Sequence, residues 1–329
     1  MEKWKVVYTD TLYPDIKIEE DVLKQIGAEV VFADSKDLRT LREKIRDCDA
    51  LIVTDTLIND ALLDCMEKCK VIVRSGTGYN NVDTAAAGAR GIMVANVADY
   101  CMNEVADHAM GLILDVIRKI SYLNAAVHNG VWDFAMAKNV ERLNRLTLGL
   151  YGFGRIGQAL ALRAKAFGMK VMAYDPYLPD AVFSQQNVIK MDTAQALLAN
   201  ADVLSLHLPL SQSTRGLMDR EAFRQMKPTA YFINVSRGGL VDEEALYEAL
   251  RTGEIAGCAL DVMVQEPPDI HAPLFSLENV ILTPHSSFSS LTADVELRVK
   301  TAQAVVETYT QGQPKFWVNK DCFSSSAVV

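Results

Sequence analysis

The sequence has few basic residues, and it contains no apolar run long enough to cross a membrane. Its 329 residues include 33 Lys and Arg against 42 Asp and Glu, which gives a net charge of −9. An acidic surface argues against nucleic acid or an anionic membrane as the main partner. A transmembrane helix needs about 20 consecutive apolar residues, and no such run is present. We therefore expect neither nucleic acid nor a membrane among the direct partners.

Glycine (18) and proline (10) are too few for a fibrous or linker-dominated protein. The chain has the composition of a globular protein, with 50% apolar and 23% charged residues. At about 100–200 residues per domain, its length suggests two domains. The N-terminal sequence MEKWK runs into a strand pattern with no apolar leader and no cleavage site, so we expect a cytoplasmic protein.

The six cysteines are scattered and form no CxxC pair. None has a histidine at zinc-finger spacing, so reduced and mostly buried thiols are the simplest interpretation. Cys65 and Cys69 lie four positions apart on a predicted helix, which leaves two metal ligands on one helix face as an alternative. We expect no metal site.

Short apolar runs alternate with helical patterns along most of the chain. Strands are predicted at 5–9, 29–33, 50–54, 71–74, 92–95, 147–151, 170–174, 203–206, 230–235, 256–262 and 280–283. Helices are predicted at 19–26, 38–46, 103–122 (with Asn103 as N-cap) and 291–309, and the tail 324–329 is expected to be disordered. Such alternation is typical of parallel sheets covered by helices, which bind ligands where the strand order reverses.

A glycine-rich turn stands between one predicted strand and a helical pattern. Residues 147–176 read TLGLYGFGRIGQALALRAKAFGMKVMAYDP, with Gly152, Gly154 and Gly157 in GxGxxG spacing. Gly152 permits the tight turn, Gly154 lets the backbone approach a pyrophosphate, and Gly157 allows close helix–strand packing. The next strand ends at Asp175, where a carboxylate accepts from ribose hydroxyls and repels a 2′-phosphate. The pattern predicts a dinucleotide site that favours NAD over NADP, and the alternative is a glycine-rich turn with a surface aspartate.

Three residues with useful chemistry follow predicted strands in the C-terminal half. They are Arg237 in NVSRGGLVD, Glu266 in ALDVMVQEP and His285 in LTPH. Taken singly, each is consistent with an ordinary loop or surface residue. Together they supply a cation for a carboxylate and a histidine whose protonated form a carboxylate stabilises. That set suits the reduction of a ketone by hydride, because the oxygen needs a proton donor and a cation beside it.

With these motifs, the sequence resembles the D-specific 2-hydroxyacid dehydrogenase family over about residues 5–312. The motifs that carry the resemblance are VRSGTGYNNVD (73–83), NEVADHAMGL (103–112), YGFGRIGQALA (151–161), YDPY (174–177), HLPLSQSTRGLM (207–218), INVSRGGLVDEEAL (233–246), ALDVMVQEP (259–267) and TPH (283–285). Within the family it looks most similar to the branch that holds the C-terminal-binding proteins, which are NAD(H)-binding corepressors. That similarity rests on ALRAKAFG (161–168), YDPYL (174–178) and VNKD (318–321).

The resemblance implies a reversible hydride transfer between NADH and a 2-oxo acid. His285 would protonate the substrate oxygen, Glu266 would orient His285 and stabilise its cationic form, and Arg237 would bind the substrate's carboxylate and carbonyl. Besides the fingerprint residues, the cofactor would lie beside Arg155, Ile156, His207, Thr214, Val235 and Asp261. Of these, Asp261 would hold the nicotinamide carboxamide. The substrate would meet Arg74 and the backbone N–H groups of a loop formed by Ser75, Gly76, Thr77 and Gly78.

The resemblance also implies the fold and the division of the chain. The fold would be α/β, with two doubly wound parallel-sheet domains and a Rossmann cofactor domain inserted into a flavodoxin-like substrate domain. Residues 1–101 and 290–329 would form the substrate domain, and residues 102–289 would form the NAD-binding domain. Because the family usually dimerises through the inserted domain, we expect a homodimer.

Some features of the sequence leave alternatives open. After His285 most relatives carry a Gly-containing stretch, whereas this chain reads Ser286-Ser287-Phe288-Ser289. Phe288 is therefore expected either to line the substrate pocket, favouring larger side chains, or to pack at a domain hinge. The similarity to the corepressors leaves an NAD(H)-sensing binding protein as an alternative function. Arg74 leaves 3-phosphoglycerate as an alternative substrate.

Overall fold

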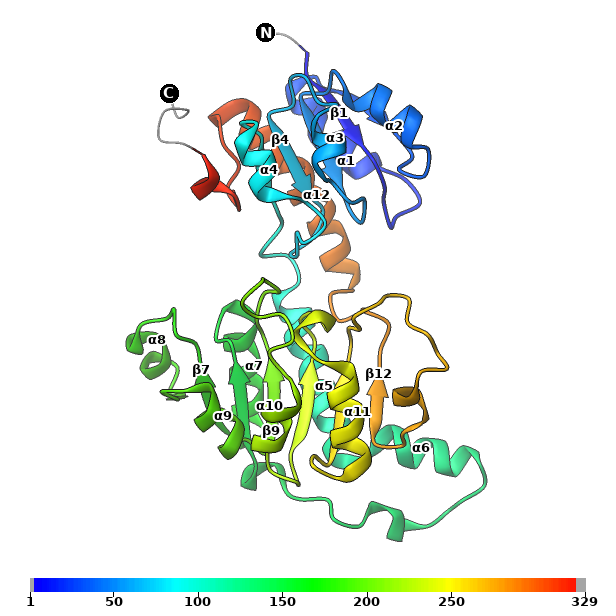
Figure 1. Cartoon of the computed structure of the whole chain (residues 1–329), viewed down its shortest axis with the longest axis vertical. Coiled ribbons are helices and arrows are strands. Elements are labelled where there is room, and N and C mark those ends of the chain that lie inside the picture. The colour runs from blue at the N-terminus through cyan, green and yellow to red at the C-terminus, as the bar shows by residue number, and fades with distance from the viewer. Residues whose placement is uncertain (1–2, 324–329) are drawn as a thin grey trace. The chain divides into compact units, whose positions relative to one another are not determined.

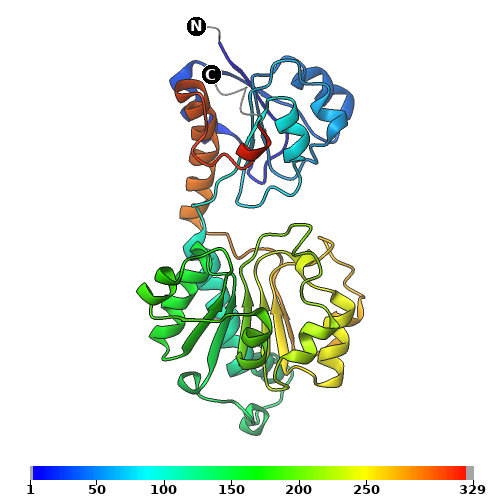
Figure 2. The same ribbon diagram turned by 60° about the vertical axis from the view of Figure 1, so that its left-hand side comes forward.

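The computed structural model describes residues 3–323, which form two α/β units (Figures 1 and 2). The two ends of the chain, up to Cys101 and from Ser290, build one unit, and Met102–Ser289 build the other. The assignment of the substrate to the unit built by the chain ends and of the cofactor to the other unit stays a prediction. The predicted disorder of residues 324–329 lies outside the described residues. Among residues 3–323, no helix has the length and apolar character that a membrane span requires.

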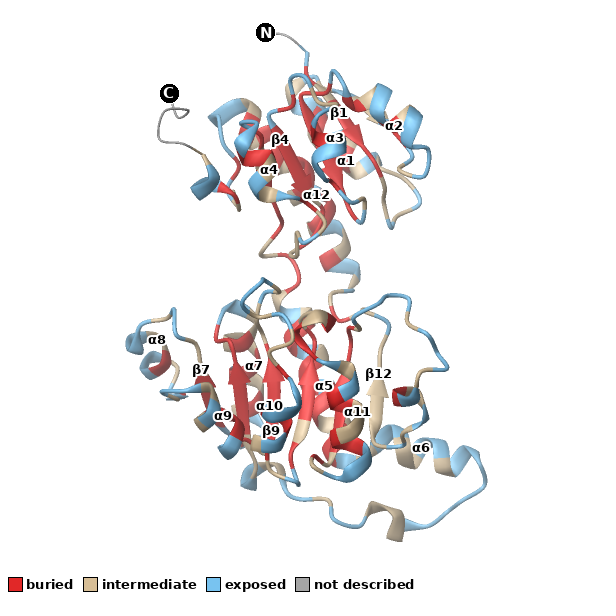
Figure 3. Ribbon diagram, in the orientation of Figure 1, coloured by how far each residue is buried: buried red, intermediate tan, exposed pale blue. Residues whose placement is uncertain are grey.

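The unit built by the chain ends contains a parallel sheet in the order β2-β1-β3-β4-β5. Its strands are β1 (Lys5–Tyr8), β2 (Glu29–Phe32), β3 (Ala50–Val53), β4 (Val71–Arg74) and β5 (Met93–Ala95). One face is covered by α1 (Lys17–Leu23), which continues into η1 (Lys24–Ile26), and by α12 (Leu291–Gln311). The other is covered by α2 (Leu38–Ile45), α3 (Asp60–Leu63) and α4 (Thr84–Ala89). This is the predicted flavodoxin-like strand order, and burial on both faces explains the continuous apolar runs of the central strands (Figure 3).

The inserted unit contains a parallel sheet in the order β12-β11-β10-β9-β6-β7-β8. Its strands are β6 (Thr147–Tyr151), β7 (Lys170–Tyr174), β8 (Ile189–Lys190), β9 (Val203–Leu206), β10 (Tyr231–Asn234), β11 (Gly257–Leu260) and β12 (Val280–Leu282). One face carries α5 (Met102–Arg118) and α7 (Arg155–Ala166), and the other carries α9 (Ala194–Asn200), α10 (Arg220–Gln225) and α11 (Glu243–Thr252) (Figure 1). The strand order reverses between β6 and β9, as in a Rossmann fold. The predicted α/β class with two doubly wound parallel sheets is confirmed.

The predicted helix at 103–122 is interrupted at Lys119. This residue has a left-handed φ of 57° and separates α5 from α6 (Ile120–His128). The Asp115 side chain accepts from the Ser121 N–H at 2.7 Å, which satisfies a donor that the interrupted ladder leaves open. Asn103 is not an N-cap, because α5 begins at Met102 and places it inside the first turn.

Two further details differ from the sequence predictions. Cys65 and Cys69 do not share a helix face, because α3 ends at Leu63. Their thiols donate to the carbonyl oxygens of Ala61 and Val71, at 3.2 and 3.5 Å. The strand β8 was not predicted, because two residues are too short to show a periodic pattern.

A buried ion pair joins the two chain segments of the first unit. Arg298 of α12 donates through Nε and Nη2 to the two carboxylate oxygens of Glu19 of α1, at 2.9 and 2.8 Å. The Glu19 side chain is fully buried, and that of Arg298 is 9% exposed. Hydrogen bonding to Glu19 raises the pKa of Arg298 above its ordinary value. The pair therefore fastens the last long helix to the first one.

Replacing Arg298 by methionine is expected to lower the free energy of unfolding by about 3–5 kcal/mol, because the Glu19 carboxylate would stay buried without its partner. Arg251→Met is the matched control, since Arg251 and Glu248 form a pair whose side chains are 52% and 35% exposed. Loss of such a pair costs at most about 1 kcal/mol. Urea denaturation followed by circular dichroism measures both, and equal losses would contradict a fastening role for Arg298.

Candidate active site

The candidate catalytic residues meet at the carboxyl edge of the seven-stranded sheet. β10, β11 and β12 are neighbouring parallel strands. Asp261 directly follows β11, and Arg237 and His285 lie three residues beyond the ends of β10 and β12. Because parallel strands end at one edge, the loops that carry these residues lie side by side.

His285 and Glu266 form a short hydrogen bond, with 2.6 Å between Nδ1 and Oε2. The other carboxylate oxygen, Oε1, accepts from the Met263 N–H at 2.9 Å. Burial opposes the ionisation of Glu266, but the hydrogen bonds from His285 and Met263 outweigh it, and the pKa of Glu266 lies below its ordinary value. An ionised Glu266 on Nδ1 leaves Nε2 of the half-exposed imidazole to exchange a proton with a bound molecule.

The segment that carries His285 is held by the carboxylate of Asp261, which is only 1% exposed. Oδ1 accepts from the Thr283 hydroxyl at 2.6 Å and from the Ser286 N–H at 2.9 Å. Oδ2 accepts from the Ser287 N–H at 2.9 Å. These bonds bracket His285, whose φ of 52° is unusual for a residue with a Cβ and needs such support. The structure thus gives Asp261 a role in shaping this segment, and its contact with a nicotinamide carboxamide stays a prediction.

Arg237 is placed by Asn234, the last residue of β10, which the sequence analysis did not single out. The Asn234 amide donates to the Arg237 carbonyl at 2.9 Å, and its oxygen accepts from the Ser236 N–H at 3.0 Å. Gly238 brings this loop against the next one, because a Cβ there would lie 2.0 Å from the carbonyl carbon of Met263. The charge of Arg237 accordingly contributes to the low pKa of Glu266. The sequence signal for Asn234 was a polar residue within the predicted apolar strand 230–235.

The glycine-rich turn lies between β6 and α7, where the strand order reverses. Gly152 has a φ of 90°, and a Cβ on it would lie 2.4 Å from the His207 carbonyl oxygen. A Cβ on Gly157 would lie 2.7 Å from the carbonyl oxygen of Gly152. Around Gly154, in contrast, a Cβ would meet no atom within 4 Å. Gly154 caps α7 without a side-chain hydrogen bond, so the helix N-terminus offers its N–H groups to an anion.

Asp175 follows β7 and lies next to this turn. Its Oδ2 accepts from the Phe153 N–H, and its Oδ1 accepts from the Tyr177 N–H, each at 3.0 Å. The carboxylate thereby fixes the turn and remains half-exposed toward solvent. A negative charge at this position suits ribose hydroxyls and disfavours a 2′-phosphate. The other predicted contacts differ in exposure: Arg155 is exposed, Ile156 is half-buried and Val235 is buried.

His207 lies after β9, on the other side of the strand reversal. Its Nε2 is 2.9 Å from the Ser205 hydroxyl, and its Nδ1 is buried with no hydrogen-bond partner in the described part of the chain. Burial lowers the pKa of His207 to about 4, so the ring is neutral at physiological pH. An orphaned buried nitrogen beside the glycine turn is the kind of group that a bound polar ligand satisfies. With the open space at Gly154 and the carboxylate of Asp175, it makes the site fit NAD.

Two other predicted residues have local roles in the structure. The Thr214 hydroxyl donates to the Pro209 carbonyl at 2.7 Å and accepts from the Ser211 N–H at 2.8 Å, so it shapes its own loop. Phe288 lies edge-on to the His285 ring, with 6.2 Å between the ring centroids. The contacts of Thr214 with a cofactor and of Phe288 with a substrate stay predictions.

Within residues 3–323, no cluster of three or more His, Cys, Asp or Glu residues is arranged to hold a metal ion.

In the other unit, Arg74 ends β4 and precedes the Ser75–Gly78 loop. Its Nε donates to the Thr54 carbonyl at 3.1 Å, and its Nη2 is 3.7 Å from an oxygen of Asp55. The side chain is 20% exposed, and burial lowers the pKa of Arg74 from its ordinary value. No described residue accepts a hydrogen bond from the N–H groups that follow Ser75 in this loop. A buried cation beside such N–H groups has the character of an anion site.

The inserted unit therefore has the features of a dinucleotide-binding domain with an acid–base pair at its carboxyl edge. Residues 110–287 match the family model described as "D-isomer specific 2-hydroxyacid dehydrogenase, NAD binding domain". The chain belongs to the D-isomer-specific 2-hydroxyacid dehydrogenase family, and the matched residues support NAD as its cofactor. Both the predicted family and the predicted cofactor are confirmed.

Proteins with curated names are similar over most of this chain. It is 43% identical over 288 residues to a D-3-phosphoglycerate dehydrogenase of Methanocaldococcus jannaschii, covering 87% of this chain and 54% of that protein. It is 37% identical to a D-3-phosphoglycerate dehydrogenase of Mycobacterium leprae, covering 88% and 55%. The chain thus spans about half the length of these relatives. The predicted similarity to the corepressor branch stays a prediction.

Solved structures of the family share the fold. A glyoxylate reductase from Paecilomyes thermophila superimposes with a TM-score of 0.88 at 25% identity, covering 98% of this chain and 100% of that one. A D-lactate dehydrogenase from Aquifex aeolicus, complexed with NAD and lactic acid, has a TM-score of 0.83 at 26% identity, covering 93% and 96%. Proteins that are named for different substrates therefore share this fold.

Two glycine substitutions separate the folding and binding roles of the turn. Gly152→Ala is expected to destabilise the protein without ligand by about 1–3 kcal/mol, because of its positive φ and the clash with the His207 carbonyl. Gly154→Ala is expected to leave the melting temperature unchanged and to weaken NADH binding by about tenfold, because the methyl group enters the open space. Thermal melts and NADH fluorescence titrations measure both effects. If Gly154→Ala kept the wild-type affinity for NADH, this would contradict a role of the turn in binding the pyrophosphate.

Proposed function

We propose that the protein is an NAD-dependent D-2-hydroxyacid dehydrogenase that interconverts a small or medium 2-oxo acid and its D-2-hydroxy acid. The observation that carries the proposal is the 2.6 Å bond between Glu266 and His285, beside Arg237 at the carboxyl edge of the NAD-binding sheet. When bound, NADH supplies the hydride. The proton donor, its carboxylate partner and a cation for the substrate come from side chains of this chain.

The three residues have distinct roles in the proposed reaction. In reduction, His285 gives its Nε2 proton to the carbonyl oxygen, and in oxidation it takes the proton from the hydroxyl group. Glu266 fixes the tautomer through Nδ1 and stabilises the imidazolium with its negative charge. The guanidinium of Arg237 binds the substrate carboxylate and polarises the carbonyl. We further propose that Arg74 and the Ser75–Gly78 loop bind an anionic group of the substrate.

The names of the two relatives described above favour 3-phosphoglycerate as one candidate substrate. Arg74 is the feature of this chain that suits it, because a guanidinium binds a phosphate or a carboxylate equally well. A panel of 2-oxo acids that includes 3-phosphohydroxypyruvate, pyruvate, glyoxylate, hydroxypyruvate and phenylpyruvate tests the substrate class. Loss of NADH absorbance at 340 nm identifies the substrate, and a chiral assay of the product tests for the D-isomer.

Replacing His285 by alanine is expected to lower kcat by about 10²–10⁴-fold, because the substrate oxygen loses its proton donor. NADH affinity, measured by fluorescence titration, should stay near that of the wild type. His271→Ala is the matched control, since His271 is an exposed histidine of the same unit, and it should leave turnover unchanged. A His285→Ala protein with the wild-type rate would contradict the assigned role. Absence of turnover by the wild type with NADH binding intact would favour the NAD(H)-sensing binding protein instead.

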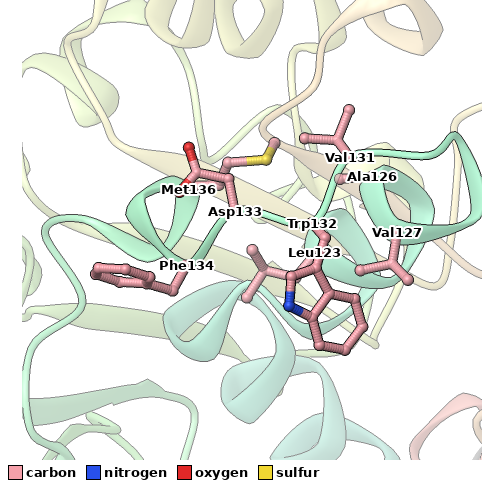
Figure 4. A pocket seen from close by; sticks show the side chains of 8 residues that line it. All are labelled: Leu123, Ala126, Val127, Val131, Trp132, Asp133, Phe134 and Met136. Carbon is pink, nitrogen blue, oxygen red and sulfur yellow. The ribbon is translucent and has the colours of Figure 1, made fainter.

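We also propose that the protein forms a homodimer through α6 and the segment after it. This region, which includes η2 (Phe134–Ala137), surrounds a pocket shown in Figure 4. The pocket is lined by Leu123, Ala126, Val127, Val131, Trp132, Asp133, Phe134 and Met136. The side chains of Trp132 and Phe134 are among the most exposed apolar groups described, at 89% and 93%. Clustered exposed aromatic residues are typical of an interface, and a second copy of the inserted unit is the proposed partner.

A double substitution, Trp132→Ser with Phe134→Ser, is expected to produce a monomer, because it removes the large apolar groups of this face. Sedimentation velocity measures the oligomeric state, and circular dichroism checks that the variant folds. Leu291→Ser is the control, since Leu291 is 90% exposed but lies in the other unit, and it should leave the dimer intact. A wild-type protein that sediments as a monomer would contradict the proposal.

A further inference from the structure

Asp10 follows β1 and binds the turn that follows β3. Its carboxylate accepts hydrogen bonds from the N–H groups of Thr54 (3.0 Å), Asp55 and Thr56 (3.1 Å). It also accepts from the hydroxyls of Thr9 and Thr56, the latter at 2.8 Å. Because it binds three successive N–H groups, the Asp10 carboxylate fixes the backbone of the turn at residues 54–56.

Asp10 carries its negative charge under ordinary conditions. Burial opposes ionisation, but the hydrogen bonds from the Thr9 hydroxyl and from the N–H groups of Thr54 and Asp55 outweigh it. The pKa of Asp10 therefore lies below its ordinary value. A fixed negative charge thus lies at the carboxyl edge of the five-stranded sheet.

The turn that Asp10 holds supplies the partners of Arg74. The Thr54 carbonyl accepts from Nε of Arg74 at 3.1 Å, and Asp55 provides the carboxylate 3.7 Å from Nη2. The Asn81 amide donates to the same Thr54 carbonyl, also at 3.1 Å, which fixes its direction. Burial lowers the pKa of Arg74, and the negative charges of Asp55 and Asp10 act against this effect. Asp10 therefore affects Arg74 both through the turn and through its charge.

Gly76 leaves room for the guanidinium because it has no side chain. A Cβ on Gly76 would be 1.7 Å from Nη1 of Arg74, so the guanidinium occupies the space that any other residue's side chain would fill. Gly76 also has a φ of 144°, which other residues rarely adopt. Arg74 is thus confined between the Thr54–Thr56 turn and the backbone of its own loop, and a shift of the turn would move it.

We propose that Asp10 is a positioning residue that sets Arg74 for an anionic group of the substrate. The inference rests on the proposed function, in which Arg74 binds the substrate. Asp10 does not touch the substrate, because its oxygens are engaged by the turn. It acts by fixing the carbonyl that orients Arg74 and by placing a negative charge near the guanidinium.

Asp10→Asn is the principal test, because it keeps the size of the side chain but removes the charge and replaces an acceptor by a donor. KM for the 2-oxo acid is expected to rise on the order of tenfold, since a small displacement of a binding group has such effects. We expect kcat to change by less than about twofold, because binding and not chemistry is altered. NADH affinity should be unchanged.

Asp37→Asn is the matched control. Asp37 caps α2 by accepting from the N–H and hydroxyl of Thr40, at 3.1 and 2.6 Å, and is thus another aspartate that holds backbone in the same unit. These hydrogen bonds stay within the first turn of α2, so the loss of the Asp37 carboxylate should leave KM unchanged. Thr56→Val, which removes one donor to Asp10, is a milder variant should Asp10→Asn fold poorly, and its KM should rise less.

A double-mutant cycle with Arg74→Ala distinguishes positioning from a general structural role. If Asp10 acts through Arg74, adding Asp10→Asn to Arg74→Ala will raise KM no further than Arg74→Ala alone. Independent, multiplying effects on KM would overturn the inference, as would an unchanged KM in Asp10→Asn. A wild-type protein that reduces no 2-oxo acid refutes the proposed function, whereas turnover that is indifferent to Asp10→Asn refutes this inference alone.

Discussion

The buried carboxylate of Asp261 is the interaction on which the candidate active site depends. It joins the end of β11 to the segment after β12 through hydrogen bonds from Thr283, Ser286 and Ser287. Hydrogen bonds to a charged group contribute about 1.5–3 kcal/mol each, enough to hold His285 in its positive-φ conformation. The backbone conformation of His285 therefore sets the position of its imidazole ring. The hydrogen bond from Nδ1 to Glu266 then fixes the tautomer of the ring.

The parallel sheet brings the three candidate catalytic residues together. Arg237, Glu266 and His285 come from three different loops, but the strands before those loops are adjacent and end at the same edge. The contact between Gly238 and the Met263 backbone closes the gap between two of the loops, and the Met263 N–H in turn holds Glu266. A cation, a carboxylate and an imidazole are thus held within one charge network before any substrate is present.

The sequence was sufficient for those features that depend on local pattern. Strands buried on both faces appear as unbroken apolar runs, and each predicted strand lies within about two residues of its observed ends. The glycine spacing similarly indicated the turn at Gly152. The sequence was insufficient where one side chain decides the local structure. The left-handed Lys119 divides a helix whose apolar pattern continues, and the role of Asp10 depends on a distant backbone partner that folding brings to it. In Asp10 that partner is Thr54, 44 positions along the chain, which no local pattern reports.

Two largely buried arginines of the first unit show how a structural charge differs from one held for a ligand. Arg298 has both oxygens of Glu19 within 2.9 Å, and its pKa is raised. Arg74 has one carbonyl and a carboxylate 3.7 Å away whose side chain is 72% exposed, and its pKa is lowered. A cation buried with so little compensation costs free energy, and a fold retains it where a ligand brings the missing charge. The proposed binding of an anionic substrate at Arg74 accounts for this cost. It also explains why Asp10 would be needed, because Asp10 holds the turn that supplies the few partners of the Arg74 guanidinium.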